Sequence, residues 1–343
     1  MRRQLLMMVS AFIVSCSVEQ SSDDDIETVA GISWHAEVRP IIETNCVSCH
    51  AEGRIGGFAL DSYDDVYAWR ASVADAVESG RMPPWKPDAD CRPLQNDLSM
   101  ASDEIDTLVA WVEAGAPEGD PETSSAGDPW EPIELLRVDQ TLSMPVAYSP
   151  EDGSDDDYRC FALDWPYEED VYVTGYTVNP GNASMVHHVI AYLIDSDDLG
   201  ELDALDPNGE GYSCFGGPGV GSQESAHWLG GWAPGSFQGG LPEGTGILVE
   251  SGSKVVLQIH YNLEADDGGT DLTTLDVMVE DKVDRPAQIQ PWADPSWLDG
   301  ANMVIPANST DVSHSFSYTI PLNVRIYTGN LHMHEIGRSA RLS

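Results

Sequence analysis

The chain has 343 residues, 41% of them hydrophobic, and its 58 acidic residues outweigh 16 Lys and Arg residues to give a formal net charge of −42. This length predicts more than one domain, and the apolar content is sufficient for buried cores. The negative charge excludes nucleic acid and anionic lipid as main binding partners and is typical of a soluble secreted protein. Acidic runs such as Asp23-Asp24-Asp25 and Asp155-Asp156-Asp157 lack EF-hand spacing, so we expect solvated loops there rather than calcium sites.

The N-terminus carries the pattern of a bacterial export signal. Two arginines precede an apolar run over residues 5–14, which is too short to span a bilayer as a mature helix. The run leads into Ile13-Val14-Ser15-Cys16, which resembles a lipobox. We therefore expect residues 1–16 to be a lipoprotein signal peptide and Cys16 to carry the lipid. An ordinary cleaved signal is the alternative, and both place the protein outside the cytoplasm, facing the periplasm or the cell exterior.

A Ser- and Asp-rich stretch over residues 17–30 predicts a flexible acidic linker. The following region, residues 31–118, contains Cys46-Val47-Ser48-Cys49-His50, the C-x-x-C-H signature of covalent c-type haem attachment. The thiols of Cys46 and Cys49 would form thioethers with the haem, and His50 would be an axial iron ligand. A zinc or redox cysteine pair is the alternative, but zinc needs two further ligands, and none has the right spacing.

The iron would need a second axial ligand from a later loop. Met82 is the candidate, because the two prolines that follow it restrict the backbone holding its sulfur; a role in the core is the alternative. Apolar spacing predicts a helix before the haem motif, a second over residues 66–77 and a third that begins at Ser102 as N-cap and ends at Gly115. Together they predict a small all-α cytochrome c domain.

A linker over residues 119–129 separates this domain from a region of all-β texture. Short runs rich in Val, Ile, Tyr and Thr alternate there with Gly, Pro and Asp turns, which predicts a sandwich or jelly roll. No internal repeat is evident. The expected strands are residues 171–178, 186–194, 246–249, 254–263 and 272–279.

Export to an oxidising compartment determines the expected state of the remaining cysteines. Cys16 is assigned to the lipid, and Cys46 and Cys49 are assigned to the haem. The cysteines that remain are Cys91, Cys160 and Cys214. Cys160 and Cys214 flank the segment that holds two adjacent histidines, and we expect them to form a disulfide. Cys91 has no assigned role.

Histidines mark three strand-like segments of the β region. His187 and His188 are adjacent in the first, His260 lies in the second, and His332 and His334 are two residues apart in the third. Burying an unpaired polar ring costs a few kcal/mol, so ligation of a metal is the expected explanation. His332 and His334 would face one side of a strand, about 6.6 Å apart. His187 and His188 would face opposite sides, so their joint ligation needs a bulge or a strand end.

Imidazole ligands suit copper, zinc or iron, and no carboxylate accompanies these histidines to form a facial-triad iron site. The other histidines of the region and its surroundings have no motif around them. We expect surface or hydrogen-bonding roles for His35, His227 and His314.

Six motifs occur in an order and spacing that carry a family resemblance. They are Tyr158-Arg159-Cys160, His187-His188, Gly231-Trp232-Ala233-Pro234-Gly235, Leu241-Pro242-Glu243-Gly244, Leu257-Gln258-Ile259-His260-Tyr261 and Leu331-His332-Met333-His334-Glu335-Ile336-Gly337. Over roughly residues 130–343 the chain resembles the copper type II, ascorbate-dependent monooxygenases. That family includes peptidylglycine α-hydroxylating monooxygenase and dopamine β-monooxygenase.

The resemblance implies two jelly-roll domains, each holding one copper across a solvent-filled cleft. The first would cover residues 130–285, and residues 286–343 would be the start of the second. His187, His188 and His260 would bind the electron-storing copper, and the catalytic, oxygen-activating copper would be held by His332 and His334.

The chain departs from the family at two positions. The family's second copper takes a methionine well downstream of the His-x-His motif, whereas this chain ends at Ser343, so we expect a truncated sequence. Met303 is a weaker candidate, and Met333 should face away from the ligands. Peptide-amidating members carry an arginine two residues before the first of these histidines, where this chain has Asn330, so peptide amidation is disfavoured.

The expected function is that of an exported haem–copper monooxygenase, which hydroxylates a C–H bond with O₂ and receives electrons through the c-type haem. Its partners would be a small-molecule substrate and an external electron donor, either ascorbate or a redox protein, with a lipid anchor as the contact with membrane. A periplasmic electron-transfer or copper-binding protein without oxygen chemistry is the main alternative. A zinc hydrolase is the other, but no glutamate is placed as a general base on a histidine-containing helix.

Overall fold

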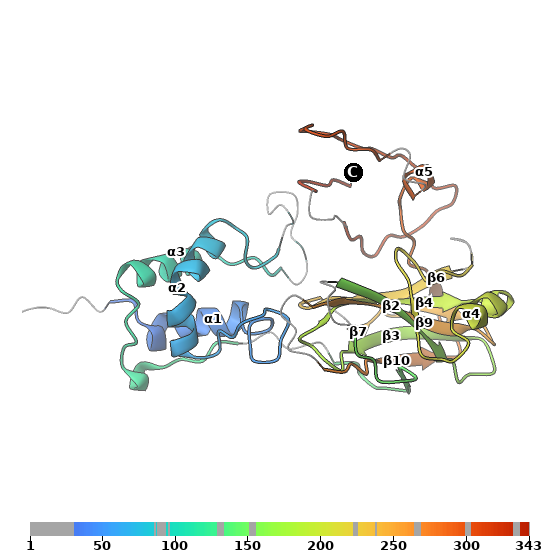
Figure 1. Ribbon diagram of the computed structural model, residues 1–343, viewed down its shortest axis with the longest axis horizontal. Coiled ribbons are helices and arrows are strands. Elements are labelled where there is room, and N and C mark those ends of the chain that lie inside the picture. The colour runs from blue at the N-terminus through green and yellow to red at the C-terminus, as the bar shows by residue number, and fades with distance from the viewer. Residues whose placement is uncertain are drawn as a thin grey trace, which may run out of the picture.

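The computed structural model describes residues 31–85, 87, 94, 97–128, 134–150, 156–221, 226–236, 239–263, 269–298, 303–331 and 337–342. A small helical region comes first and a β domain of two sheets follows, as two separate lobes (Figure 1). The expected change from helical to β structure along the chain is therefore confirmed. After the short helix α5 (Pro295–Leu298), the described residues continue without regular secondary structure.

The helical region is built on one buried apolar cluster. A π-helix, η1 (Trp34–Val38), runs directly into α1 (Arg39–Asn45), and α2 (Tyr63–Glu78) and α3 (Ser102–Glu113) complete the set, with a short 3-10 helix, η2 (Pro121–Thr123), after them. The helices expected before the haem motif, over residues 66–77 and from residue 102 are all present. Their shared core consists of Trp34, Val38, Ile42, Leu60, Val66, Val73, Leu108, Trp111 and Ala116.

The start of α3 differs from the expectation by one residue. Ser102 is the first helical residue, and Ala101 occupies the N-cap position. The Ala101 N–H donates to the Glu104 carboxylate at 3.0 Å, so a side chain from the first turn satisfies this backbone group. The predicted end is confirmed, because Gly115 follows the helix with φ of +89°, a conformation that favours glycine.

The β domain is a sandwich of two mainly antiparallel sheets. One sheet has the order β1-β10-β3-β8-β11, with β7 also paired to β3, and the other has the order β5-β2-β9-β4-β6. The strands are β1 (Gln140–Ser143), β2 (Asp156–Asp164), β3 (Val171–Asn179), β4 (Val186–Ile194), β5 (Tyr212–Ser213), β6 (Ala226–Trp232), β7 (Gly239–Gly240), β8 (Thr245–Val249), β9 (Lys254–Asn262), β10 (Thr274–Glu280) and β11 (Arg285–Ala287).

All five strands expected from the sequence are present, as β3, β4, β8, β9 and β10. The others were not predicted, and β2 is the important omission because it borders β9. The acidic run before it was interpreted as a solvated loop. That interpretation is wrong for Asp156 and Asp157, which are the first two residues of β2.

The central strand β9 is buried on both faces. Its alternate residues Val255, Leu257, Ile259 and Tyr261 belong to the core between the two sheets. The residues between them face outward, where Val256 joins a second apolar cluster with Leu202 of α4 (Leu199–Leu205) and Val220. Burial on both faces explains why β9 is a nearly continuous apolar run. The short 3-10 helix η3 (Ser196–Asp198) leads into α4.

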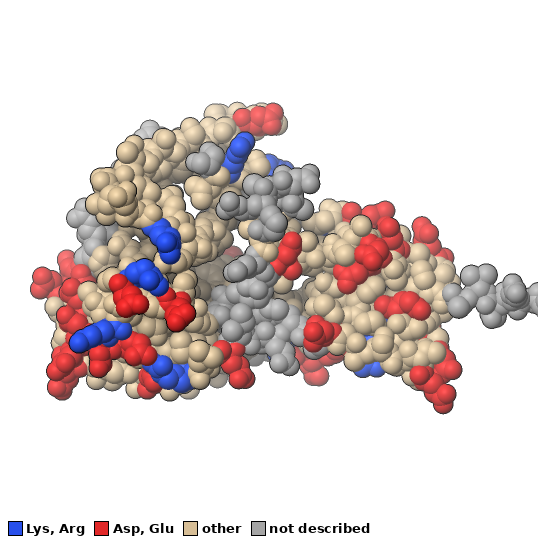
Figure 2. Space-filling view, turned by 180° about the vertical axis from the view of Figure 1, so that it is seen from behind, with Lys and Arg blue, Asp and Glu red and all other residues tan. Residues whose placement is uncertain are grey.

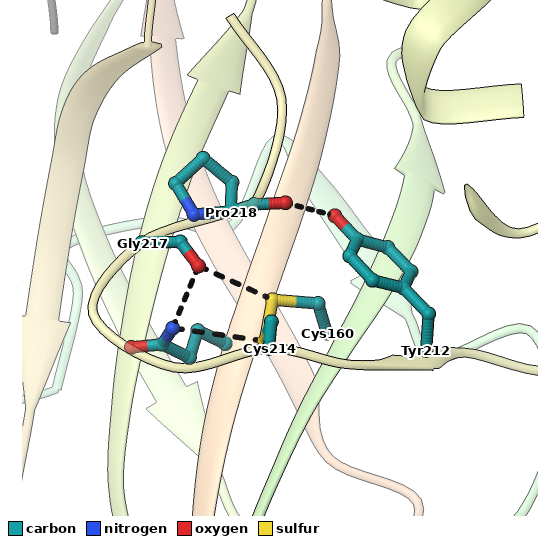
Figure 3. The surroundings of a disulfide bond; sticks show 6 residues. Cys160, Tyr212, Cys214, Gly217 and Pro218 are labelled. Atoms are coloured by element: carbon teal, nitrogen blue, oxygen red, sulfur yellow. Dashed lines mark hydrogen bonds between the residues drawn. A yellow bond between two sulfur atoms is a disulfide. The ribbon is translucent and has the colours of Figure 1, made fainter. Parts of the chain in front are cut away.

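The predicted Cys160–Cys214 disulfide is confirmed and lies on this outer face (Figure 3). It joins β2 to the loop after β5. The same loop is fixed by the Tyr212 hydroxyl, which donates to the Pro218 carbonyl, and by the Gln258 amide, which donates to the Gly217 carbonyl at 2.9 Å. A structural disulfide is typical of an extracytoplasmic compartment, which agrees with the expected export.

Acidic side chains are spread over both lobes on the face shown in Figure 2, with few basic ones between them. This face of both lobes is therefore predominantly acidic. Among the described residues, no helix is both long enough and apolar enough to cross a bilayer. The proposed lipid-bearing Cys16 lies outside the described residues, as does Cys91.

Replacing both cysteines of the disulfide with alanine should destabilise the β domain. The bridge spans 54 positions of sequence, so its loss should lower the free energy of unfolding by about 2–4 kcal/mol. Urea denaturation of the full chain measures this, with the Cys46→Ala/Cys49→Ala double variant as the control for loss of two thiols. Equal midpoints for the β-domain transition with and without a reducing agent would contradict the prediction.

Candidate metal centre

A β-bulge brings the adjacent histidines of β4 to the same side of the sheet. The register of β4 on β9 shifts between Val186 and His188, and His188 pairs with His260. Val186 and Val189 both lie in the core between the sheets, which leaves His187 and His188 together on the outer face. Joint ligation by this pair required a bulge or a strand end, and the bulge is present.

Three imidazoles from β4 and β9 converge through the same ring atom. Nδ1 of His187 lies 3.2 Å from Nδ1 of His188 and 3.1 Å from Nδ1 of His260. Nδ1 of His188 lies 3.3 Å from Nδ1 of His260, so the three atoms form a nearly equilateral triangle. The centre of such a triangle is about 1.9 Å from each corner, close to the ~2.0 Å between an imidazole nitrogen and a bound metal. We call these three residues the histidine triad. Within the described residues it is the group whose ligand atoms could hold a metal ion.

Hydrogen bonding alone cannot satisfy the triad. Each Nδ1 atom is either protonated and a donor or unprotonated and an acceptor. In a closed set of three contacts, at least one contact therefore joins two donors or two acceptors, which repel. A cation at the centre removes the conflict, because it accepts the lone pairs of all three unprotonated Nδ1 atoms. The chemistry of the donor set thus fits a metal such as copper.

Two residues of β2 hold the ring of His260 in place. Its Nε2 lies 2.6 Å from the Asp156 carboxylate, and the Tyr158 ring stacks on it with centroids 4.1 Å apart and planes inclined by 7°. Tyr158 itself meets the edge of Phe215, whose loop is held by the disulfide. Asp156 was missed at the sequence level, although its position two residues before Tyr158 on a strand would have placed both on one face.

Electrostatics around the triad favours a neutral imidazole at His187. Desolvation of the His187 ring lowers its pKa, and the neighbouring His260 lowers it further, whereas Asp156 acts in the opposite direction. Burial raises the pKa of Tyr158, and the negative charge of Asp156 adds to this, so the phenol stays protonated. Neutral imidazole is the form that binds a metal.

The cysteine pair and the histidine of the haem motif lie in one turn after α1. The N–H groups of Cys49 and His50 both donate to the Cys46 carbonyl, at 3.1 and 2.8 Å. The following loop folds back over the histidine so closely that a Cβ on Gly56 would lie 2.4 Å from its Nδ1, which explains the glycine. His50 Nδ1 is 3.3 Å from the Phe58 carbonyl and can only donate to it. This leaves Nε2 unprotonated for a metal such as haem iron.

The thiols of this motif differ from those of a redox pair. Cys46 and Cys49 are free, and burial raises the pKa of Cys46 to about 12, with smaller contributions from Cys49 and Glu104. Redox Cys-x-x-Cys motifs depend instead on a lowered thiol pKa. Burial also lowers the pKa of His50, so its ring is neutral. The raised thiol pKa therefore disfavours the redox alternative, and covalent haem attachment stays a proposal.

The two methionines considered as metal ligands lie in exposed positions. Met82 lies after α2 and is 43% exposed, and Met303 is 50% exposed. His35 lies 3.6 Å from a Glu118 carboxylate oxygen, and the His314 ring meets the edge of Trp297. The proposed second copper ligands, His332 and His334, lie outside the described residues, together with Met333.

Comparison with known proteins assigns no family to this chain. No protein-family model matches it, and the search of curated proteins found no significant match. The sandwich and the histidine triad are compatible with the copper-enzyme resemblance carried by the sequence motifs, and they leave the assignment as a proposal.

Copper binding should depend on each member of the triad. His188→Ala removes one of three donors, so the affinity for Cu(I) should fall by at least ~100-fold, because two imidazoles leave the coordination incomplete. Competition with a chromogenic copper chelator measures this. The matched control is His227→Ala, which removes an imidazole at the far end of the same β4–β6 pair. A similar loss in the control, or none in His188→Ala, would refute the assignment.

The desolvated thiol of Cys46 should be chemically inert in the folded chain. In protein prepared without haem and kept reduced, alkylation of Cys46 at pH 8 should be at least ~10-fold slower than in the same protein unfolded in urea, because the reactive thiolate is scarce at a pKa of about 12. Mass spectrometry of the Cys46 peptide over time follows the reaction. Equal rates in the folded and unfolded states would show that burial does not control this thiol.

Proposed function

We propose that the chain is an exported haem–copper monooxygenase that hydroxylates a C–H bond of a small molecule with O₂. The observation that carries the proposal is the convergence of three Nδ1 atoms from β4 and β9. It supports the interpretation of His187, His188 and His260 as the ligands that the resemblance to copper type II monooxygenases implies. The proposal includes the finer features of that family, namely a jelly-roll topology and a second domain, which would begin after β11 because β11 pairs with β8 of the sandwich.

Copper held by the triad would supply one-electron redox chemistry at a site with fixed ligands. The protein's own contribution is geometric: the bulge presents His187 and His188 together, and β9 supplies His260. The triad lies at the outer surface of its sheet, with His187 exposed and His260 buried. A site of this kind can exchange electrons with an external group while keeping a stable ligand set.

The helical region would deliver electrons to the β domain. Its Cys46, Cys49 and His50 would hold a c-type haem, which supplies single electrons, and Met82 is the proposed second axial ligand. The support is the placement of both cysteines and His50 in one turn after α1, and the hydrogen bond from Nδ1 of His50 that leaves its Nε2 unprotonated. The ultimate donor would be ascorbate or a redox protein.

Oxygen activation belongs to His332 and His334 in this proposal. Their spacing on an extended segment would direct both rings to one side, which is the arrangement needed for one metal. The substrate is proposed as a small molecule other than an amidated peptide precursor, because Asn330 stands where peptide-amidating relatives carry an arginine. A lipid on Cys16 would tether the protein to the membrane that it faces.

Haem reoxidation by O₂ tests the proposal. The protein is reduced anaerobically, O₂ is admitted, and the haem absorbance is followed with copper loaded and with copper removed. Copper should accelerate reoxidation at least ~10-fold if the helical region feeds the metal centre, and His260→Ala should abolish the acceleration. His227→Ala should retain it. Equal rates with and without copper would refute a joint electron path.

Product analysis separates the oxygenase from its alternatives. Consumption of O₂ with incorporation of one oxygen atom into a small molecule supports a monooxygenase. Copper-dependent haem oxidation without an oxygenated product would instead identify an electron-transfer protein. Zinc as the metal bound after purification, with no copper uptake, would overturn both in favour of a zinc site.

A further inference from the structure

We infer that Asp156 is a positioning residue of the metal centre, which holds His260 in the tautomer and orientation that present Nδ1 to the metal. The inference rests on metal binding by the triad, as proposed above, and not on oxygenase activity. Nothing in the histidine motifs of the sequence pointed to this carboxylate, because Asp156 belongs to an acidic run that suggested a solvated loop.

The hydrogen bond determines the tautomer. Asp156 Oδ1 lies 2.6 Å from His260 Nε2, and an ionised carboxylate can only accept, so Nε2 carries the proton. Nδ1 is then left with its lone pair directed at the centre of the triad. A short bond to a charged acceptor is stronger than a neutral one. The imidazole with Asp156 behind it is therefore a preformed ligand with the correct nitrogen free.

The sheet register places the carboxylate behind the ring. Tyr158 of β2 pairs with His260 of β9, and Asp156 pairs with Asn262. Residues two apart on a strand share a face, so Asp156 and Tyr158 both lie on the face that carries His260. Asp156 is diagonal to the histidine, within the usual reach of a cross-strand neighbour. The contact thus follows from strand pairing rather than from a chance loop conformation.

Two contacts together leave the His260 ring little freedom. Tyr158 lies flat against one face of the ring, with centroids 4.1 Å apart, while Asp156 holds its Nε2 edge. The His260 side chain is 8% exposed and that of Asp156 is 55% exposed. The ligand is buried, and its carboxylate partner connects it to the surface. Carboxylate–histidine–metal arrangements of this kind orient the ring and raise its strength as a ligand.

The charge of Asp156 also has a defined effect on the bound metal. A negative group behind one ligand stabilises Cu(II) more than Cu(I), because the oxidised ion carries the larger charge. Asp156 should therefore lower the Cu(II)/Cu(I) reduction potential of the site. A residue needed only for folding would have no such selective effect on one oxidation state.

Four substitutions in the full chain test the inference, three at Asp156 and one at its neighbour. Asp156→Ala removes both the hydrogen bond and the charge, and Asp156→Asn keeps an acceptor oxygen but removes the charge. The matched control is Asp157→Asn, which removes the same charge from the neighbouring residue, whose carboxylate binds the Tyr148 hydroxyl instead of a histidine. Cu(I) and Cu(II) affinities are measured by chelator competition, the potential by redox titration, and the Cu(II) spectrum by electron paramagnetic resonance.

Asp156→Ala should weaken Cu(II) binding about 10–100-fold and Cu(I) binding less, so the reduction potential should rise. Asp156→Asn should give a smaller change in the same direction. Asp156→Glu keeps the carboxylate and should therefore bind Cu(II) more tightly than Asp156→Ala does. The control should match the unsubstituted protein in affinity, potential and spectrum. Unchanged affinity and potential in Asp156→Ala, or an equal change in the control, would overturn the inference. If the unsubstituted protein binds no copper, the proposed metal centre fails instead, so the two failures are distinguishable.

Discussion

The histidine triad depends on one extra residue in β4. Without the bulge after Val186, His187 would point into the core between the sheets, where an unpaired imidazole is costly. Asp271 bonds to the segment before the bulge and to β9: its fully buried carboxylate accepts from the Asn182 N–H at 3.0 Å and from the Tyr261 hydroxyl at 2.9 Å. Tyr261 directly follows His260 on β9. The same buried group therefore anchors the approach to the bulge and the strand that supplies the third ligand.

The outer face of β9 changes its role along the strand. At its start, Val256 packs in the apolar cluster beneath α4. In the middle, Gln258 bonds to the Gly217 carbonyl and holds the disulfide-bonded loop on the sheet. At its end, His260 enters the triad. Since the inner face of the strand is apolar throughout, the sandwich core supports the strand, and the outer face is free to build a rigid ligand and the loop beside it.

The parts that the sequence predicted are those with a strong local pattern. The long apolar runs of β4 and β9, the need for a bulge or a strand end at His187-His188, and the Cys160–Cys214 pair all follow from periodicity or from cysteine chemistry. Strand β2 was missed because it opens with acidic residues, and hydrophobic pattern does not reveal a carboxylate whose partner is a histidine on a neighbouring strand. The N-cap of α3 lies one residue before the predicted Ser102, at Ala101, whose N–H donates to the Glu104 side chain.

His50 and His260 each hydrogen-bond through one ring nitrogen and leave the other unprotonated, but the nitrogen that bonds differs between them. His50 donates from Nδ1 to the Phe58 carbonyl and keeps Nε2 free, whereas His260 faces Asp156 through Nε2 and keeps Nδ1 free. The acceptors also differ: a neutral carbonyl leaves the ligand's donor strength nearly unchanged, while a carboxylate increases it. In the inferred arrangement, the imidazole of the β domain would be the stronger donor of the two and would favour the higher oxidation state of a metal bound by the triad.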